Sequence, residues 1–327
     1  MDTAPLGKSS LRISRIGLGS APFGREIDEE TSRSILDYAL EHGINLIDTA
    51  EAYGGGNAKL GRKTAYDIDD SREVTDEMHS AEKIIGRWLK DHGNRDQVSL
   101  CTKFNTGGRP EQVRQSLSDS LERLQTDYVD TYMLHVWFKD VPIGETLGAL
   151  NDEVKAGRIR TIGCSNFTAD QVREAQNAAT SLGLARINSV QPPFSLADSA
   201  ARDDLLPYCV KEHIATMTYS PLAAGFLTGK YTHSEIPKGS RFDVVPGHTN
   251  VYFNDRCFEI VEKLKSLSAE SGESMPRLAM SWVFQHPGVT SILVGARKLS
   301  HLDNALEAMD NPVDPSLHTR MNAWLDT

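Results

Sequence analysis

Short apolar runs alternate with longer amphipathic stretches along almost the whole chain, and this alternation limits the folds open to it. Buried parallel strands read as short apolar runs, and the helices that cover them place apolar residues three and four positions apart. The predicted strands are Arg15–Leu18, Asn45–Asp48, Val98–Thr102, Tyr128–Leu134, Ile159–Gly163, Ser189–Gln191, Ala215–Tyr219 and Ser291–Val294. The predicted helices begin near Glu29, Ala81, Glu111, Ile143, Ala169, Ala200, Pro276 and Leu302, and Thr168 is the expected cap of the helix from Ala169.

Eight strand and helix pairs in 327 residues predict a closed (β/α)8 TIM barrel, an α/β fold in which residues 1–327 form a single domain. A small hairpin is predicted over Leu11–Gly19. A doubly wound sheet is the structural alternative, and it requires a GxGxxG turn after the first strand. The third glycine of Gly17–Gly24 comes too late for that motif, and Gly54–Gly56 is more simply a turn. The barrel is therefore favoured.

Two segments interrupt the alternation. Residues 57–79 are rich in charged side chains and are predicted to be an inserted surface loop. Residues 232–250 contain two prolines and two glycines and are predicted to be a second long loop. In a barrel both would lie at the carboxyl ends of the strands, where ligands bind, so either is a candidate lid.

Composition narrows the range of partners. The chain carries 35 basic and 45 acidic side chains, a net charge of −10, which disfavours nucleic acid and anionic lipid as partners. No run approaches the ~20 apolar residues that cross a bilayer, and Met1–Leu11 does not resemble a secretion signal. The four cysteines form no CxxC pair and the histidines no HExxH, so we expect free thiols, no metal site and a cytoplasmic location.

Unlike polar residues fall at the ends of the predicted strands. Asp48 ends the second strand, Tyr53 lies in the loop after it, and Lys103 and His135 follow the third and fourth strands. Each alone has an ordinary structural interpretation, as a cap, a solvated lysine or a hydrogen-bonded histidine. A barrel would bring all four to one mouth.

The four residue types suit carbonyl chemistry. A phenol has a pKa of ~10, and a neighbouring ammonium favours its phenolate form. We therefore expect Lys103, held by Asp48, to lower the pKa of Tyr53 and make it a proton donor and acceptor. His135 would donate a hydrogen bond to a carbonyl oxygen as negative charge develops there.

These positions resemble a known family. Residues 43–54, GINLIDTAEAYG, resemble the signature of the aldo-keto reductases, with Asp48 and Tyr53 in its catalytic positions. Lys103 in CTK and His135 in YMLH match the other two members of the family's tetrad. The later matching segments are Gly163–Phe167, Gln191, Tyr219–Leu222 with Gly225, Gly229 and Lys230, and Gly295–Arg297. The resemblance runs in order from about Leu6 to Ala308.

The resemblance implies a nicotinamide cofactor bound at the mouth of the barrel. Ser165, Asn166 and Gln191 would hold the carboxamide, and Tyr219 would stack on the ring. Arg297 suits the 2′-phosphate of NADPH, which is therefore expected in preference to NADH. The residues implied for the pyrophosphate, the ribose-phosphate region and the adenosine end are Ser220, Leu222, Lys230, Arg241, Gly295 and His301.

The chain departs from the family pattern in two places. Where many relatives carry a Glu-Asn pair at the adenosine end, this chain has His301, Asn304 and Ala305, so its adenine contacts differ. Residues 57–79 are longer than this region usually is, so no substrate is transferred from a relative. Aromatic residues expected near the mouth, which favour an apolar or ring-shaped substrate, are Phe23, Trp137, Phe138 and Phe194.

The function expected from these residues is reduction of an aldehyde or ketone, or oxidation of the matching alcohol, with Tyr53 as the general acid or base. A Schiff-base aldolase using Lys103 is one alternative, which the partner Asp48 disfavours because a paired lysine stays protonated. An NADPH-binding regulatory or redox-sensing subunit with little turnover is the other, because some relatives serve a membrane channel.

Overall fold

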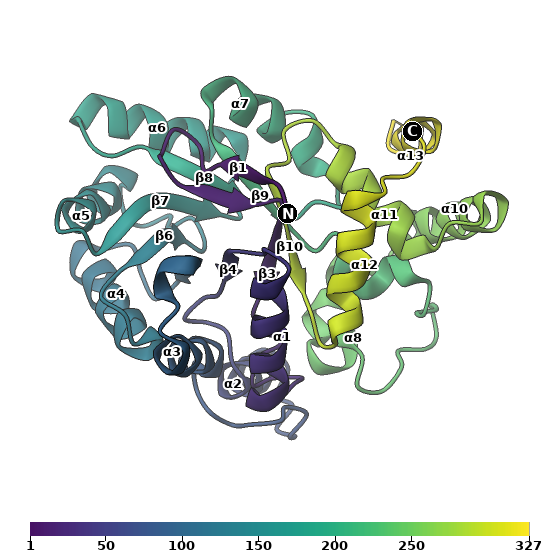
Figure 1. Cartoon of the computed structure of the whole chain (residues 1–327), viewed down its shortest axis with the longest axis horizontal. Helices are drawn as coiled ribbons and strands as arrows, with labels where there is room; N and C mark the ends of the chain where they lie inside the picture. The colour runs from purple at the N-terminus through teal and green to yellow at the C-terminus, as the bar shows by residue number, and fades with distance from the viewer. Residues whose placement is uncertain (327) are drawn as a thin grey trace.

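Eight parallel strands close into a barrel at the centre of the molecule (Figure 1). The computed structural model describes residues 1–326. Around the barrel the strand order is β10, β3, β4, β5, β6, β7, β8 and β9. Their bounds are β3 Ile16–Gly19, β4 Leu46–Asp48, β5 Ser99–Phe104, β6 Val129–Leu134, β7 Ile159–Ser165, β8 Ile187–Gln191, β9 Ala215–Tyr219 and β10 Ser291–Gly295. The predicted TIM barrel is confirmed.

Helices surround the barrel and cover the outer face of its strands (Figure 1). In α3, for example, Ile84, Ile85, Trp88 and Leu89 follow helical spacing and are buried against the barrel. The helices that alternate with the strands are α1 Glu29–Glu41, α3 Ser80–His92, α4 Pro110–Leu124, α5 Ile143–Lys155, α6 Ala169–Leu182, α7 Leu205–Glu212, α11 Met275–Gln285 and α12 Leu299–Asp310. Because both faces of each strand are covered, the strands read as apolar runs in the sequence.

A short antiparallel hairpin closes the amino-terminal end of the barrel. Its strands are β1 Thr3–Pro5 and β2 Arg12–Ser14, and its Leu6 and Ile13 are fully buried in the interior cluster of the barrel. The predicted hairpin over Leu11–Gly19 is therefore misplaced, because the second half of that segment is the first barrel strand.

Further helices lie outside the regular alternation. They are α2 Gly55–Tyr66, α8 Arg241–Val244, α9 Thr249–Tyr252, α10 Asp255–Ser271 and α13 Pro315–Ala323, with short 3-10 turns at η1 Arg95–Gln97, η2 Ala200–Arg202, η3 Ala223–Thr228 and η4 Pro246–His248. The sequence prediction omitted α10, although its buried Ile260, Leu264 and Leu267 follow helical spacing.

The prediction of a loop over residues 57–79 is wrong for its first ten residues, which belong to α2. This helix buries only Gly55, Gly56 and Arg62, so no apolar periodicity marks it in the sequence. Residues 67–79 form neither helix nor strand. Residues 232–250 likewise contain α8 and η4. Both segments lie at the carboxyl ends of the strands, beside the loops that carry the polar residues.

All four cysteines are free and buried. Across residues 1–326 no helix is both long and apolar enough to span a bilayer.

Candidate active site

Three neighbouring strands bring the four expected catalytic residues together. Asp48 is the last residue of β4, Lys103 lies near the end of β5, and His135 follows β6. The parallel register pairs Asp48 with Cys101 and Lys103 with Met133, so the side chains at these strand ends face one mouth. Tyr53 reaches the same place from the loop between β4 and α2.

Lys103 lies at the centre of the group and is fully buried. Its Nζ donates to Asp48 Oδ2 at 2.8 Å, to the carbonyl oxygen of Thr49 at 2.8 Å and to Tyr53 Oη at 3.5 Å. Burial is the largest single influence and opposes the positive charge, but Asp48, Tyr53 and Cys101 together raise the pKa of Lys103 above its ordinary value. The lysine is therefore an ammonium with a fixed position.

The pKa of Tyr53 is shifted in the opposite direction to the expected one. Burial raises the pKa of Tyr53 above its usual value near 10, although the charge of Lys103 acts to lower it. Desolvation prevails over the ammonium, which lies 3.5 Å from the phenol, and the negative charge of Asp48 raises the pKa of Tyr53 further. The expected net lowering of the pKa is therefore wrong, and Tyr53 is a neutral phenol at physiological pH.

His135 is a neutral side chain beside the phenol. Burial, assisted by the charge of Lys103, lowers the pKa of His135 to about 3. Its ring meets the Tyr53 ring edge-on, with 5.7 Å between centroids. Its Nδ1 is buried without a hydrogen-bond partner among residues 1–326. The tautomer with the proton on Nε2 leaves only an acceptor unpaired, so Nε2 is the nitrogen that can donate to a substrate oxygen.

The residues expected at the nicotinamide end also meet at the mouth, and they are joined to one another. Ser165 Oγ donates to the carbonyl oxygen of Gln191 at 2.8 Å, and Tyr219 Oη donates to Asn166 Oδ1 at 2.8 Å. Asn166 Nδ2 in turn donates to the carbonyl oxygen of His135 at 2.9 Å. Tyr219 and Asn166 are therefore linked to the backbone that follows β6, and Ser165 is linked to the backbone of β8.

Gln191 has a contact that sequence reasoning did not foresee. Its Nε2 donates to Asp48 Oδ1 at 2.8 Å, while the other oxygen of Asp48 accepts a hydrogen bond from Lys103 Nζ. Both carboxylate oxygens are thus engaged, which fixes the orientation of Asp48. No sequence signal could reveal this contact, because the two residues are 143 positions apart.

The turn after β9 has an unusual backbone. Ser220, Ala223 and Ala224 have φ angles of 57°, 50° and 57°, in the left-handed region that residues with a Cβ rarely adopt. Such strain concentrates at functional sites, and successive left-handed and right-handed residues turn backbone N–H groups into an anion-binding concavity. Leu222 lies within this turn, and its carbonyl oxygen accepts from Gly225 and Leu227.

Positive charges gather next to that turn. The pKa of Lys230 is lowered by burial and by the charge of Arg297. The pKa of His301 is also lowered by burial, and by the charges of Arg297, Lys298 and Lys230. Among the described residues, no acidic side chain forms an ion pair with Lys230, Arg297 or Lys298. Gly295, the last residue of β10, leads directly into this cation cluster.

Arg241 differs from the other expected cofactor ligands. Its Nη1 lies 2.9 Å from Glu26 Oε1, and the other oxygen of Glu26 pairs with Arg25 Nε at 2.7 Å. Arg25 is buried, its Nη2 has no hydrogen-bond partner in the described chain, and its charge acts to lower the pKa of Tyr53. Sequence reasoning missed Arg25, because an arginine in a loop is normally solvated.

The expected aromatic residues are only partly at the mouth. Phe194 is fully buried and stacks on Trp282, and Phe23 is also fully buried. Trp137 and Phe138 are half-buried beside the end of β6.

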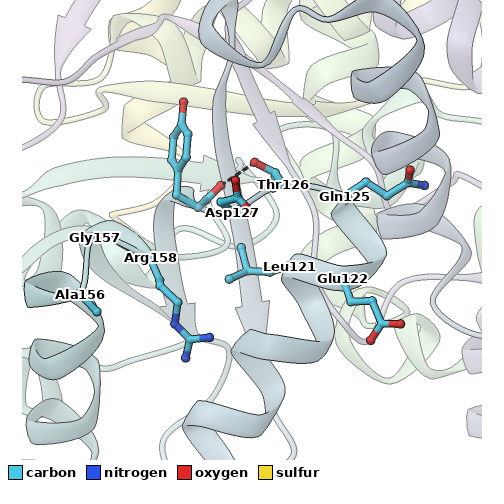
Figure 2. Close-up of a pocket in the computed structure, with 9 residues that line it drawn as sticks. Leu121, Glu122, Gln125, Thr126, Asp127, Ala156, Gly157 and Arg158 are labelled. Atoms are coloured by element: carbon cyan, nitrogen blue, oxygen red, sulfur yellow. Dashed lines mark hydrogen bonds between the residues drawn. The ribbon is translucent and has the colours of Figure 1, made fainter.

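A surface depression lies elsewhere. It has a volume of about 690 Å³ and lies between the end of α4 and the starts of β6 and β7, where Thr126 Oγ1 donates to the carbonyl oxygen of Tyr128 (Figure 2). Because the strands are parallel, this is the amino-terminal face of the barrel. None of the expected catalytic residues lines it, so it is not the candidate active site.

Comparison with known proteins agrees with the geometry of the mouth. The model of the family described as "Aldo/keto reductase family" matches residues 15–326. The chain is 32% identical to the aldo-keto reductase YhdN of Bacillus subtilis, over 93% of this chain and 87% of that protein. It is 31% identical to a protein of Escherichia coli named NADH-specific methylglyoxal reductase, over 90% of each chain. It is 30% identical to a probable voltage-gated potassium channel subunit beta of Arabidopsis thaliana, over 93% of this chain and 90% of that one.

Proposed function

The chain belongs to the aldo/keto reductase family, and on that premise we propose that it reduces an aldehyde or ketone, or oxidises the matching alcohol, using NADPH. The observation that carries the proposal is the contact of a buried ammonium, Lys103 Nζ, with both Asp48 and the phenol of Tyr53. Four buried free thiols support a reducing, cytoplasmic setting.

In this proposal Tyr53 supplies the proton and His135 orients the substrate. When bound, the cofactor supplies a hydride to the carbonyl carbon. The substrate oxygen accepts a hydrogen bond from His135 Nε2 and takes the phenolic proton from Tyr53 Oη as negative charge develops on it. An alkoxide is far more basic than a phenolate, so proton transfer from Tyr53 to the substrate oxygen is favourable. Lys103 stabilises the phenolate that remains.

The raised pKa of Tyr53 also bears on direction. Alcohol oxidation requires the phenolate as a base, and burial makes that form scarce near neutral pH. Carbonyl reduction requires the neutral phenol, which predominates. The form of Tyr53 that predominates at neutral pH is therefore the one that carbonyl reduction requires.

The residues present fit a dinucleotide with an additional phosphate. Lys230, Arg297 and Lys298 form a cluster of cations that has no acidic partner within residues 1–326, and an anion bound there would relieve their mutual repulsion. The left-handed turn from Ser220 suits the pyrophosphate. At the other end Gln191 has committed its Nε2 to Asp48, so its Oε1 is the atom left for a carboxamide N–H. The remaining proposed ligands at the mouth are Ser165, Asn166, Tyr219, Leu222, Arg241, Gly295 and His301.

The test is steady-state turnover of aldehydes, quinones, keto sugars and cyclic ketones, with NADPH and NADH in parallel. Tyr53→Phe removes only the hydroxyl, so it should fold and bind cofactor as the wild type does, yet lose turnover by about a hundredfold or more. Circular dichroism and cofactor fluorescence serve as controls. Near-wild-type turnover in Tyr53→Phe would contradict the role of the phenol.

The relative named as a potassium channel subunit supports one alternative, an NADPH-binding regulatory or redox-sensing subunit with little turnover. A rapid single turnover of bound NADPH followed by negligible steady-state activity on the whole panel would favour it. Sustained turnover on any member of the panel would exclude it in favour of the enzyme.

A further inference from the structure

Two segments at the mouth of the barrel contact each other although they are far apart in the sequence. One is the insertion, residues 57–79. The other is the strap, residues 239–252, which contains α8, η4 and α9. The strap begins beside β10, where Arg297 Nη1 donates to the carbonyl oxygen of Gly239 at 3.0 Å. It passes the loop after β3, where Arg241 pairs with Glu26, and then reaches α2. It therefore crosses the rim above β10 and β3, next to the proposed cofactor ligands.

The insertion is organised around Arg62, a buried side chain in α2 with 3% exposure. Its Nη2 donates to Glu73 Oε2 at 2.8 Å and to the carbonyl oxygen of Asp70 at 2.7 Å, and its Nη1 also contacts Glu73. The carboxylate of Glu73 is itself fully buried. One hydrogen bond from the insertion to the strap runs from Arg62 Nη1 to the carbonyl oxygen of Val244, at 3.2 Å.

Two further residues of the insertion, Arg72 and Tyr66, also contact the strap. Arg72 Nη1 donates to the carbonyl oxygen of Asp243 and lies 3.4 Å from its carboxylate. Tyr66 Oη packs so closely on Gly247 that a Cβ there would lie only 2.5 Å from it. In the described chain, every hydrogen bond or ion pair that reaches residues 243–248 from outside the strap comes from the insertion.

The opposite end of the strap is held by other means. Phe242 is buried among Phe226, Tyr231 and Phe253, and Arg241 and Gly239 have the partners given above. Loss of the insertion contacts would therefore free residues 243–248 while the ends stay attached. A dinucleotide lying against Lys230 and Arg297 would have the strap beside it on the outer rim.

We propose that Arg62 is a positioning residue: it anchors the strap to the insertion, and this anchor sets the rate at which the cofactor enters and leaves the mouth. The second half of the inference rests on the proposed function. Arg62 suits the role because its planar fork of five donors reaches Glu73 bidentately, Asp70 and the strap at the same time, whereas a lysine has three donors and no fork.

The test replaces the buried pair as a unit. Arg62→Met alone would leave Glu73 as a buried unpaired charge, which is strongly destabilising, so Arg62→Met is combined with Glu73→Leu. Asp70 keeps Arg72 as its partner. The matched control is Lys63→Met, the next residue in α2, whose exposed ion pair with Asp69 stays within the insertion. Arg62→Lys, with Glu73 intact, retains the charge without the fork.

Two measurements decide the proposal. Hydrogen exchange in the cofactor-free protein should become about tenfold faster at the strap amides Val244, Val245 and His248 in the double variant, since the lost bond has a charged donor. Release of NADPH, followed by stopped-flow fluorescence, should accelerate by a similar factor. Arg62→Lys should fall between the double variant and the wild type, and Lys63→Met should match the wild type in both measurements.

Unchanged strap exchange in the double variant would overturn the anchor. Faster exchange with unchanged NADPH release would overturn the control of cofactor exchange. A wild type that binds neither NADPH nor NADH would overturn the proposed function and the cofactor half with it, while hydrogen exchange would still decide whether Arg62 anchors the strap.

Discussion

Lys103 and Tyr53 are both desolvated at the mouth of the barrel, and their partners of opposite charge lie at different distances. Lys103 Nζ has Asp48 at 2.8 Å, and this carboxylate, with Tyr53 and Cys101, raises the pKa of the amine despite burial. Tyr53 has its cation at 3.5 Å, which burial outweighs. The result is an ammonium beside a neutral phenol, a pair that is ready to give a proton and then to stabilise the anion left behind.

Arg297 provides the sharpest residue-level prediction about the cofactor. Arg297→Leu should weaken NADPH binding about tenfold to a hundredfold, because a charge-assisted hydrogen bond contributes about 1.5–3 kcal/mol. NADH lacks the additional phosphate and should bind nearly as before. Fluorescence titration with both nucleotides measures the two dissociation constants, and an equal loss for NADH and NADPH would contradict a phosphate contact.

At the scale of elements, the helix that follows the Ser165–Asn166 turn shows how local sequence directs a site. Thr168 caps α6 as predicted: its side chain accepts from Gln171 N, and the side chain of Gln171 accepts from Thr168 N. This reciprocal capping box fixes where the helix begins. The end of β7, with its two proposed carboxamide ligands, is thereby held against the mouth.

Loss of this cap should reduce stability without removing a proposed ligand. Thr168→Ala should lower the free energy of unfolding by about 1 kcal/mol, because the N–H of Gln171 loses its acceptor. Urea denaturation measures the change. Thr168→Ser, which retains the hydroxyl, should stay within a few tenths of a kcal/mol of the wild type, and equal losses in both variants would mean that the methyl group, not the cap, matters.

Across the whole molecule, burial keeps several histidines neutral. The pKa values of His135 and His248 are lowered to about 3 and about 4, and those of His286, His301 and His318 are also lowered, in each case mainly by burial. Each folded pKa lies below the unfolded value near 6.5. The unfolded chain therefore binds more protons below that pH, and stability falls as the pH drops from 6.5 towards the folded pKa values.

His248→Phe isolates one of these contributions. The replacement keeps an aromatic ring beside Phe242 but removes the titrating group. Between pH 7.5 and pH 4.5 the variant should lose about 2 kcal/mol less unfolding free energy than the wild type, since one pKa unit corresponds to about 1.4 kcal/mol. Urea titrations at both pH values make the comparison, and identical losses would exclude His248 as an acid-sensitive group.

The sequence alone determined the order of the barrel strands, the helices between them and the four polar residues at the mouth. These features follow from local periodicity and from the rule that parallel strands end at one face, so β4 to β6 could be read with Asp48, Lys103 and His135 in place. Where local periodicity was weak, as in α2, the sequence predicted a loop instead.

Only the tertiary structure decided the direction of the pKa shift of Tyr53, the bond from Gln191 to Asp48 and the anchoring of the strap by Arg62. Those features depend on desolvation and on contacts between residues 143 and 182 positions apart. A polar residue that is read as solvated, such as Arg62, becomes a buried structural centre only when another part of the chain covers it. Burial of this kind depends on the whole fold, and no local pattern encodes it.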